Sequence, residues 1–105
     1  MAPKPFIKLK RAIQNYPIWQ EPKSLKLLIA LLFETNEQGE AIVSLNQLLC
    51  WVHTYDTDKV FAMLQRLRTL EEIRYEIKPA ITESGRLDNR IFITVIQYKT
   101  YVEHE

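Results

Sequence analysis

Hydrophobic residues recur every three or four positions between residues 56 and 72. At about 100° per residue they fall on one broad face, formed by Val60, Met63, Leu64, Leu67 and Leu70. The opposite face is polar or small, and it is lined by Asp58, Ala62, Gln65 and Thr69, with Lys59 and Arg66 at its flanks. This pattern predicts an amphipathic helix, with Asp56 or Thr57 capping its first turn.

Shorter patterned segments lie on both sides of this helix. Before it, Ser44 is placed to cap a helix whose apolar face is formed by Leu45, Leu48, Leu49 and Val52. After it, residues 73–78 alternate between apolar and charged side chains, and residues 91–96 are rich in β-branched and aromatic residues. These two segments predict paired strands, which residues 41–43 could join as a short third strand.

The order helix, turn, longer helix and hairpin is typical of a winged helix-turn-helix. We therefore expect an α+β fold with a three-helix core and a C-terminal β-hairpin wing. The remaining core helix is expected from Leu25 to Glu34, capped by Ser24 and buried, because apolar residues surround it on nearly every side. The wing loop is expected at residues 79–90, with Gly85 at its turn.

Residues 6–101 are expected to form this single domain, because 105 residues suit one globular unit. Residues 1–5 contain two prolines and no periodicity, which predicts a flexible lead, and residues 102–105 are expected to fray. No apolar run is long enough to span a bilayer, and the N-terminus lacks the apolar region of a signal peptide. The single cysteine, Cys50, cannot form an internal disulfide, so these features favour a cytoplasmic protein.

Two stretches carry a family resemblance. The first is Phe-Ile-Lys-Leu-Lys-Arg-Ala-Ile-Gln-Asn-Tyr-Pro-Ile-Trp at 6–19, followed by Glu-Pro-Lys-Ser-Leu-Lys-Leu-Leu-Ile-Ala-Leu-Leu at 21–32. It resembles the opening of phage replisome-organiser and DnaD-like replication-initiation proteins. The second, Ile-Phe-Ile-Thr-Val-Ile-Gln-Tyr-Lys-Thr-Tyr at 91–101, resembles the strand and aromatic pair that close the same winged-helix domain. The resemblance implies a role in starting DNA replication in a phage or plasmid system.

Double-stranded DNA is the expected ligand, with the helix of residues 57–71 in the major groove. The candidate contacts on that helix are Lys59, Ala62, Gln65, Arg66 and Thr69. Gln65 and Arg66 carry the groups that discriminate base edges, while Lys59 and Thr69 suit phosphates. The alternative is an ordinary solvated helix face, which Asp58 favours because phosphates repel a carboxylate.

The wing supplies a second group of candidate DNA contacts. Lys78, Arg86 and Arg90 are cations suited to the DNA backbone or a minor groove, although Glu83 and Asp88 in the same loop weaken their field. The net charge of +1, from 14 Lys and Arg against 13 Asp and Glu, is low for a DNA-binding domain. Binding would therefore depend on how the charges are distributed. Lys23 and Lys26 are expected to serve solubility.

The aromatic residues favour a second function. Trp19 and Trp51 are expected in the core, whereas Tyr98 and Tyr101, near the chain end, are candidates for an interface. The chain could then be a protein-interaction or oligomerisation module of the same fold, forming a homodimer or a platform for a replication partner or helicase loader. A small transcriptional regulator would show the same sequence pattern as a replication factor.

Catalysis is not expected from this sequence. His53 and His104 are the only histidines, and neither lies at metal-ligand spacing from Cys50. Gly39 and Gly85 are the only glycines, so there is no glycine-rich phosphate loop. We expect no metal, no cofactor, no small-molecule substrate and no membrane association.

Overall fold

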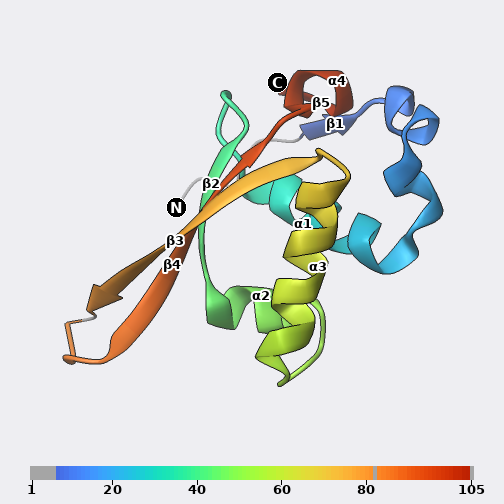
Figure 1. Cartoon of the computed structure of the whole chain (residues 1–105). Coiled ribbons are helices and arrows are strands. Elements are labelled where there is room, and N and C mark those ends of the chain that lie inside the picture. The colour runs from blue at the N-terminus through green and yellow to red at the C-terminus, as the bar shows by residue number, and fades with distance from the viewer. Residues whose placement is uncertain (1–6, 82, 105) are drawn as a thin grey trace.

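The computed structural model describes residues 7–81 and 83–104 of an α+β chain. The α-helices in this part are α1 (Pro22–Glu34), α2 (Leu45–Trp51), α3 (Thr57–Thr69) and α4 (Tyr98–Tyr101). The strands are β1 (Ile7–Leu9), β2 (Glu40–Ser44), β3 (Ile73–Ile81), β4 (Leu87–Val95) and β5 (Val102–His104). Two short 3₁₀ helices, Arg11–Asn15 and Pro17–Gln20, lead into α1 (Figure 1).

Helix α1 is the centre of the core. Its fully buried residues are Leu27, Leu28, Leu31 and Leu32. The expected cap at Ser24 is wrong, because the helix begins earlier, at Pro22, where the missing proline N–H costs nothing. The expectation of a helix buried on nearly every side is also wrong, because Phe33 is 60% exposed and Leu25 and Ile29 are only partly buried.

The main sheet is antiparallel with the order β2-β4-β3, so β4 is the central strand. Val43 and Ile77 both pair with Ile91, and alternate residues of β4, Ile91, Ile93 and Val95, are buried against the helices. The predicted third strand is confirmed by the pairing of β2. No helix among the described elements covers the other face of the sheet, which carries Phe92 and Ile42.

Helices α2 and α3 begin where the sequence predicts. The Ser44 hydroxyl accepts the Gln47 N–H at 3.2 Å, and the Gln47 side chain accepts the Ser44 N–H at 2.9 Å. Asp56 caps α3 by accepting the Asp58 N–H at 3.0 Å. On the predicted apolar face of α3, Val60, Leu64 and Leu67 are fully buried, while Met63 and Leu70 are partly buried.

The hairpin is longer and its turn shorter than expected. Strands β3 and β4 have nine residues each, so most of residues 79–90 is paired rather than looped. Pro79 of β3 lies opposite Asn89 of β4. Because β3 is an edge strand, the missing N–H of the proline is tolerated. The paired strands extend well past the helices (Figure 1).

The C-terminal segment is ordered into the fold, contrary to expectation. Strand β5 pairs with β1, so residues 102–104 do not fray. Tyr98 and Tyr101 are 5% and 0% exposed, which makes them core residues and not interface residues. Trp19, expected in the core, is 37% exposed, whereas Trp51 packs partly buried against the core. The expected lead at 1–5 lies outside the described residues.

Candidate nucleic-acid interface

The polar face of α3 is open to solvent. All five predicted DNA contacts on this helix are exposed: Lys59, Ala62, Gln65, Arg66 and Thr69. Helical geometry places Gln65, Thr69 and Ala62 along the middle of the face, with Arg66 and Lys59 on one flank and Arg68 on the other. The helix can therefore be reached by a large ligand along this side.

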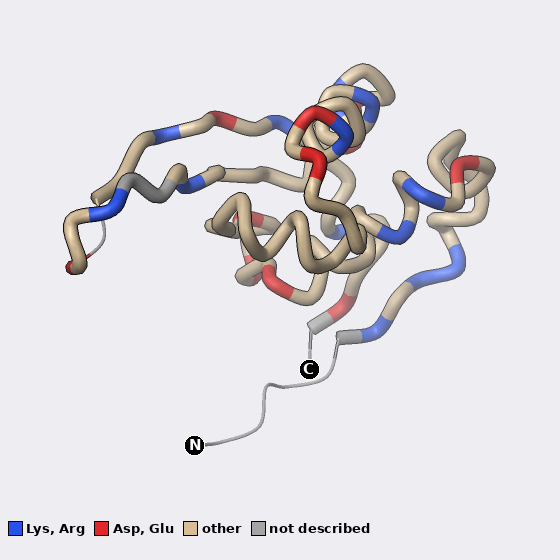
Figure 2. Tube along the Cα trace, turned by 90° about the horizontal axis from the view of Figure 1, so that it is seen from below, with Lys and Arg blue, Asp and Glu red and all other residues tan. Residues whose placement is uncertain are grey.

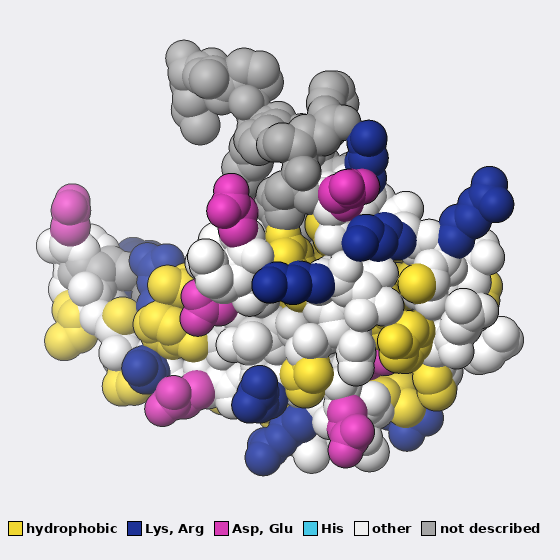
Figure 3. All heavy atoms as spheres, turned by 90° about the horizontal axis from the view of Figure 1, so that it is seen from above, with side chains coloured by type: hydrophobic (Ala, Val, Ile, Leu, Met, Phe, Trp, Pro, Cys, Tyr) yellow, Lys and Arg dark blue, Asp and Glu magenta, His cyan; other side chains and the backbone are white. Residues whose placement is uncertain are grey.

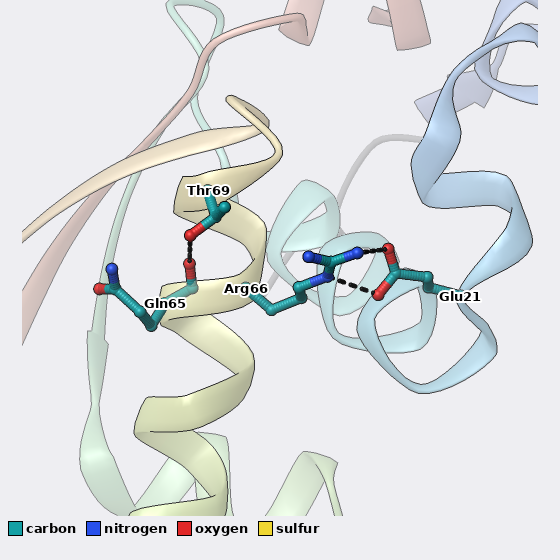
Figure 4. A network of polar contacts seen from close by, with 4 residues as sticks. All are labelled: Glu21, Gln65, Arg66 and Thr69. Atoms are coloured by element: carbon teal, nitrogen blue, oxygen red, sulfur yellow. Dashed lines mark hydrogen bonds and ion pairs between the residues drawn. The ribbon is translucent and has the colours of Figure 1, made fainter.

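Arg66 is held by an acidic partner from another element. Its Nε donates to Glu21 Oε1 at 2.8 Å and its Nη2 donates to Glu21 Oε2 at 2.9 Å, so the pair is bidentate (Figure 4). The hydrogen bond and charge of Arg66 lower the pKa of the Glu21 carboxyl, and Glu21 in turn raises the pKa of Arg66. Both groups are therefore ionised at neutral pH. The pair uses two of the five guanidinium N–H donors, which leaves three for a contact with a base edge or a phosphate.

The Gln65 side chain points away from Arg66 and toward the hairpin (Figure 4). Its side-chain oxygen accepts the Tyr75 hydroxyl at 3.2 Å, and the guanidinium of Arg68 lies 5.8 Å from the centre of the Tyr75 ring. The Thr69 hydroxyl donates to the Gln65 carbonyl at 2.9 Å, so its hydrogen is already used within the helix. Thr69 would have to break this bond to donate to a phosphate.

The wing cations do not converge on α3. Lys78 and Arg90 are direct cross-strand partners, and strand alternation puts them on the sheet face that bears Phe92, opposite the helices. The Lys78 ammonium lies 4.6 Å from the centre of the Phe92 ring and 3.9 Å from a Glu76 oxygen. Arg86 is exposed in the turn at 83–86. Basic and acidic residues alternate along β3 (Figure 2).

Sequence reasoning missed three residues that shape the α3 surface. Glu21 lies 45 positions from Arg66, and no periodicity could join them. Arg68 and Tyr75 could have been predicted from the sequence. Arg68 lies at the edge of the polar face of the helix, and Tyr75 lies in the strand that directly follows the helix. Both lie beside Gln65, so they belong to the candidate interface.

The uncovered sheet face is a second candidate surface. Ile42 of β2 is 59% exposed and pairs with Phe92 of β4. A hollow beside these two residues is also lined by Thr35, Glu40 and Thr94. Seen from above, hydrophobic side chains gather at the hairpin end of the molecule, between positive and negative ones (Figure 3).

No group of three His, Cys, Asp or Glu side chains among the described residues is placed to hold a metal ion. No helix in the same residues is long and apolar enough to cross a membrane. Comparison with protein-family models, curated proteins and solved structures finds no match to this chain.

Proposed function

We propose that the chain is a winged helix-turn-helix module that binds double-stranded DNA through α3. The order α1, β2, α2, α3, β3, β4, with β2 joined to the hairpin, supports this fold. The observation that carries the proposal is the open polar face of α3, with Lys59 on one flank and Arg68 on the other. A major groove offers base edges between two rows of phosphates, which is the arrangement that such a helix fits.

The dimensions of α3 suit this role. Its 13 residues span about 20 Å at 1.5 Å per residue, and a major groove about 12 Å wide admits one helix. Gln65 has the paired donor and acceptor that match adenine, and the Ala62 methyl group suits the thymine methyl. Thr69 lies one turn beyond Gln65 on the same face.

Electrostatics limits the affinity. The net charge is only +1, Asp58 lies in the middle of the polar face, and Glu21 neutralises Arg66. Binding therefore depends on a small number of local phosphate contacts. The resemblance of residues 6–101 to replication-initiation proteins supports replication initiation as the setting for this binding.

Fluorescence anisotropy with a labelled duplex tests the proposal. Affinity should fall between about 50 mM and 200 mM salt, because each neutralised phosphate releases counterions. Gln65→Ala should lower the preference among duplex sequences more than it lowers general binding. Lys99→Gln, which removes an exposed cation of α4 and leaves α3 and the hairpin unchanged, is the control. No binding at the lower salt concentration would contradict the proposal.

The uncovered sheet face favours self-association as a second candidate function. Ile42 is exposed beside Phe92, and an apolar strip flanked by both signs of charge suits a self-complementary contact. Light scattering over a range of concentrations should then show a dimer that Ile42→Lys converts to a monomer. A wild-type chain that stays monomeric at every concentration removes this candidate.

A further inference from the structure

The start of α1, the turn before α3 and the first turn of α3 together form a basic pocket. Lys23 and Lys26 come from α1, His53 and Thr54 from the turn, and Lys59 from α3. Val52 and Met63 complete the lining, and the cavity has a volume of about 260 Å³. Two neighbouring lysines of α1 and a lysine of α3, more distant in the sequence, are thus gathered around one hollow.

The described part of the chain does not neutralise these lysines. The ion pairs within the described residues do not involve Lys23, Lys26 or Lys59. The acidic residue nearest in sequence to Lys23 is Glu21, which is bound to Arg66. At the start of α3, Asp56 is engaged as the cap and Asp58 lies on the exposed face. Within residues 7–81 and 83–104, no carboxylate is paired with any of the three lysines.

The polar groups of the pocket are donors. Lysine ammonium groups only donate, and a histidine ring has at least one N–H in either protonation state. The Thr54 hydroxyl accepts the Asp56 N–H at 3.1 Å, which leaves its own hydrogen available to donate. Both α1 and α3 begin beside the pocket, and the positive end of each helix dipole favours an anion there. Several donors around a small cavity suit a phosphate group.

We infer that this pocket binds a phosphate group, and that in the DNA complex it holds a backbone phosphate beside α3. The inference rests on the proposed function for its ligand, because Lys59 belongs both to the pocket and to the flank of the α3 polar face. A second hollow on the same flank of α3 shares Lys23 and Met63 with the pocket and is also lined by the paired Glu21 and Arg66. The pocket, and not this second hollow, is therefore the place for a backbone phosphate, because the Glu21 carboxylate would repel one in the second hollow.

The first test is DNA binding by the double variant Lys23→Gln/Lys26→Gln. Its affinity for a duplex should be about tenfold weaker, and the slope of log affinity against log salt should be smaller by about 1. The matched control Arg11→Gln/Lys99→Gln removes the same charge from exposed positions that do not line the pocket. If both double variants lose the same affinity while the wild type binds DNA, the pocket inference is wrong and the DNA proposal stands.

The second test uses inorganic phosphate and does not require DNA. In an amide NMR titration against sodium chloride of equal ionic strength, phosphate should shift residues 23–26, 53–54 and 59, and Lys23→Gln/Lys26→Gln should abolish these shifts. If the wild type fails to bind DNA but these shifts occur, the proposed function is wrong and the pocket is a phosphate site for another ligand. If phosphate causes no shift beyond that of chloride, the pocket inference is overturned.

Discussion

Glu72 is the carboxyl group that the described fold buries most completely, with 2% of its surface exposed. The Tyr101 hydroxyl donates to Glu72 Oε2 at 2.5 Å, which ties the start of β3 to α4. Burial raises the pKa of the Glu72 carboxyl above its ordinary value of 4.5, and the hydrogen bond from Tyr101 opposes this rise in part. Burial and the bond to Glu72 also raise the pKa of Tyr101, so its phenol remains a donor.

This carboxyl should make stability fall as pH rises. The folded chain binds the Glu72 proton more tightly than the unfolded chain does. Its contribution to stability is therefore present below the unfolded-state pKa and is lost as pH rises through the higher folded-state pKa. Glu72→Gln, which keeps an acceptor for Tyr101, should lessen this fall as pH rises above the ordinary carboxyl pKa of 4.5. Urea unfolding at a series of pH values measures the free energy of unfolding of each variant, and Glu103→Gln, at an exposed position, is the control. An unchanged pH dependence in Glu72→Gln contradicts the assignment.

The Arg66–Glu21 pair leads to a prediction about DNA affinity. Glu21→Gln removes a negative charge near the helix and frees the Arg66 guanidinium, so the variant should bind DNA several-fold more tightly. Arg66→Ala should abolish this gain when the two changes are combined. Anisotropy titrations of the two single variants and the double variant measure the coupling. If Glu21→Gln weakens binding, then Glu21 positions Arg66 for DNA and does not compete with it.

Several elements end where the backbone enters the left-handed region. Gly39 has φ of 79° before β2, and Gly85 has φ of 81° in the hairpin turn. Glu71 has φ of 59° just after α3, a position where glycine is usual. These residues let the chain reverse direction tightly, which keeps the helices on one face of the sheet.

The two glycines form a matched pair for measuring steric cost. A Cβ on Gly39 would lie 2.6 Å from Tyr98 Cβ, whereas a Cβ on Gly85 would meet nothing within 4 Å. Both alanine variants should lose about 1–2 kcal/mol from the left-handed backbone, and Gly39→Ala should lose about 1–3 kcal/mol more from overpacking. Urea unfolding at one pH gives both values. Equal losses would mean that Tyr98 can move aside.

Across the whole molecule, the two ends of the described chain are joined. Strand β1 pairs with β5, and the Lys10 N–H donates to the Tyr101 carbonyl at 2.6 Å. Tyr16 and Tyr101 pack edge to face with ring centres 5.1 Å apart. Together these contacts join the described segment before α1 to the described segment after β4, so both segments contribute to one core.

The terminal pairing should contribute measurably to stability. Val102 is 4% exposed, so Val102→Ala should lower the free energy of unfolding by about 2 kcal/mol, from lost burial and the cavity left behind. Glu103→Ala, at an exposed position in the same strand, should change it by less than about 0.5 kcal/mol. Urea unfolding of both variants checks the prediction. A Val102→Ala chain as stable as the wild type would mean that β5 opens readily.

The sequence by itself determined the local elements of this protein. Periodicity located α1, α2 and α3, and the capping residues Ser44 and Asp56 located two of the helix starts, because these signals act within a few residues of one another. It also identified the exposed face of α3. The prediction of a wing loop at residues 79–90 was wrong, because a proline on an edge strand and a proline in a loop cannot be told apart in the sequence.

Only the tertiary structure decided which side chains meet. It buried Tyr98 and Tyr101, paired Glu21 with Arg66, put Lys78 and Arg90 on the far face of the sheet and gathered Lys23 and Lys26 beside Lys59. Each of these outcomes depends on chain segments far apart in the sequence, whose distance is set by packing around α1. Periodicity describes how one element presents its residues, and it carries no information about which distant element will lie against them.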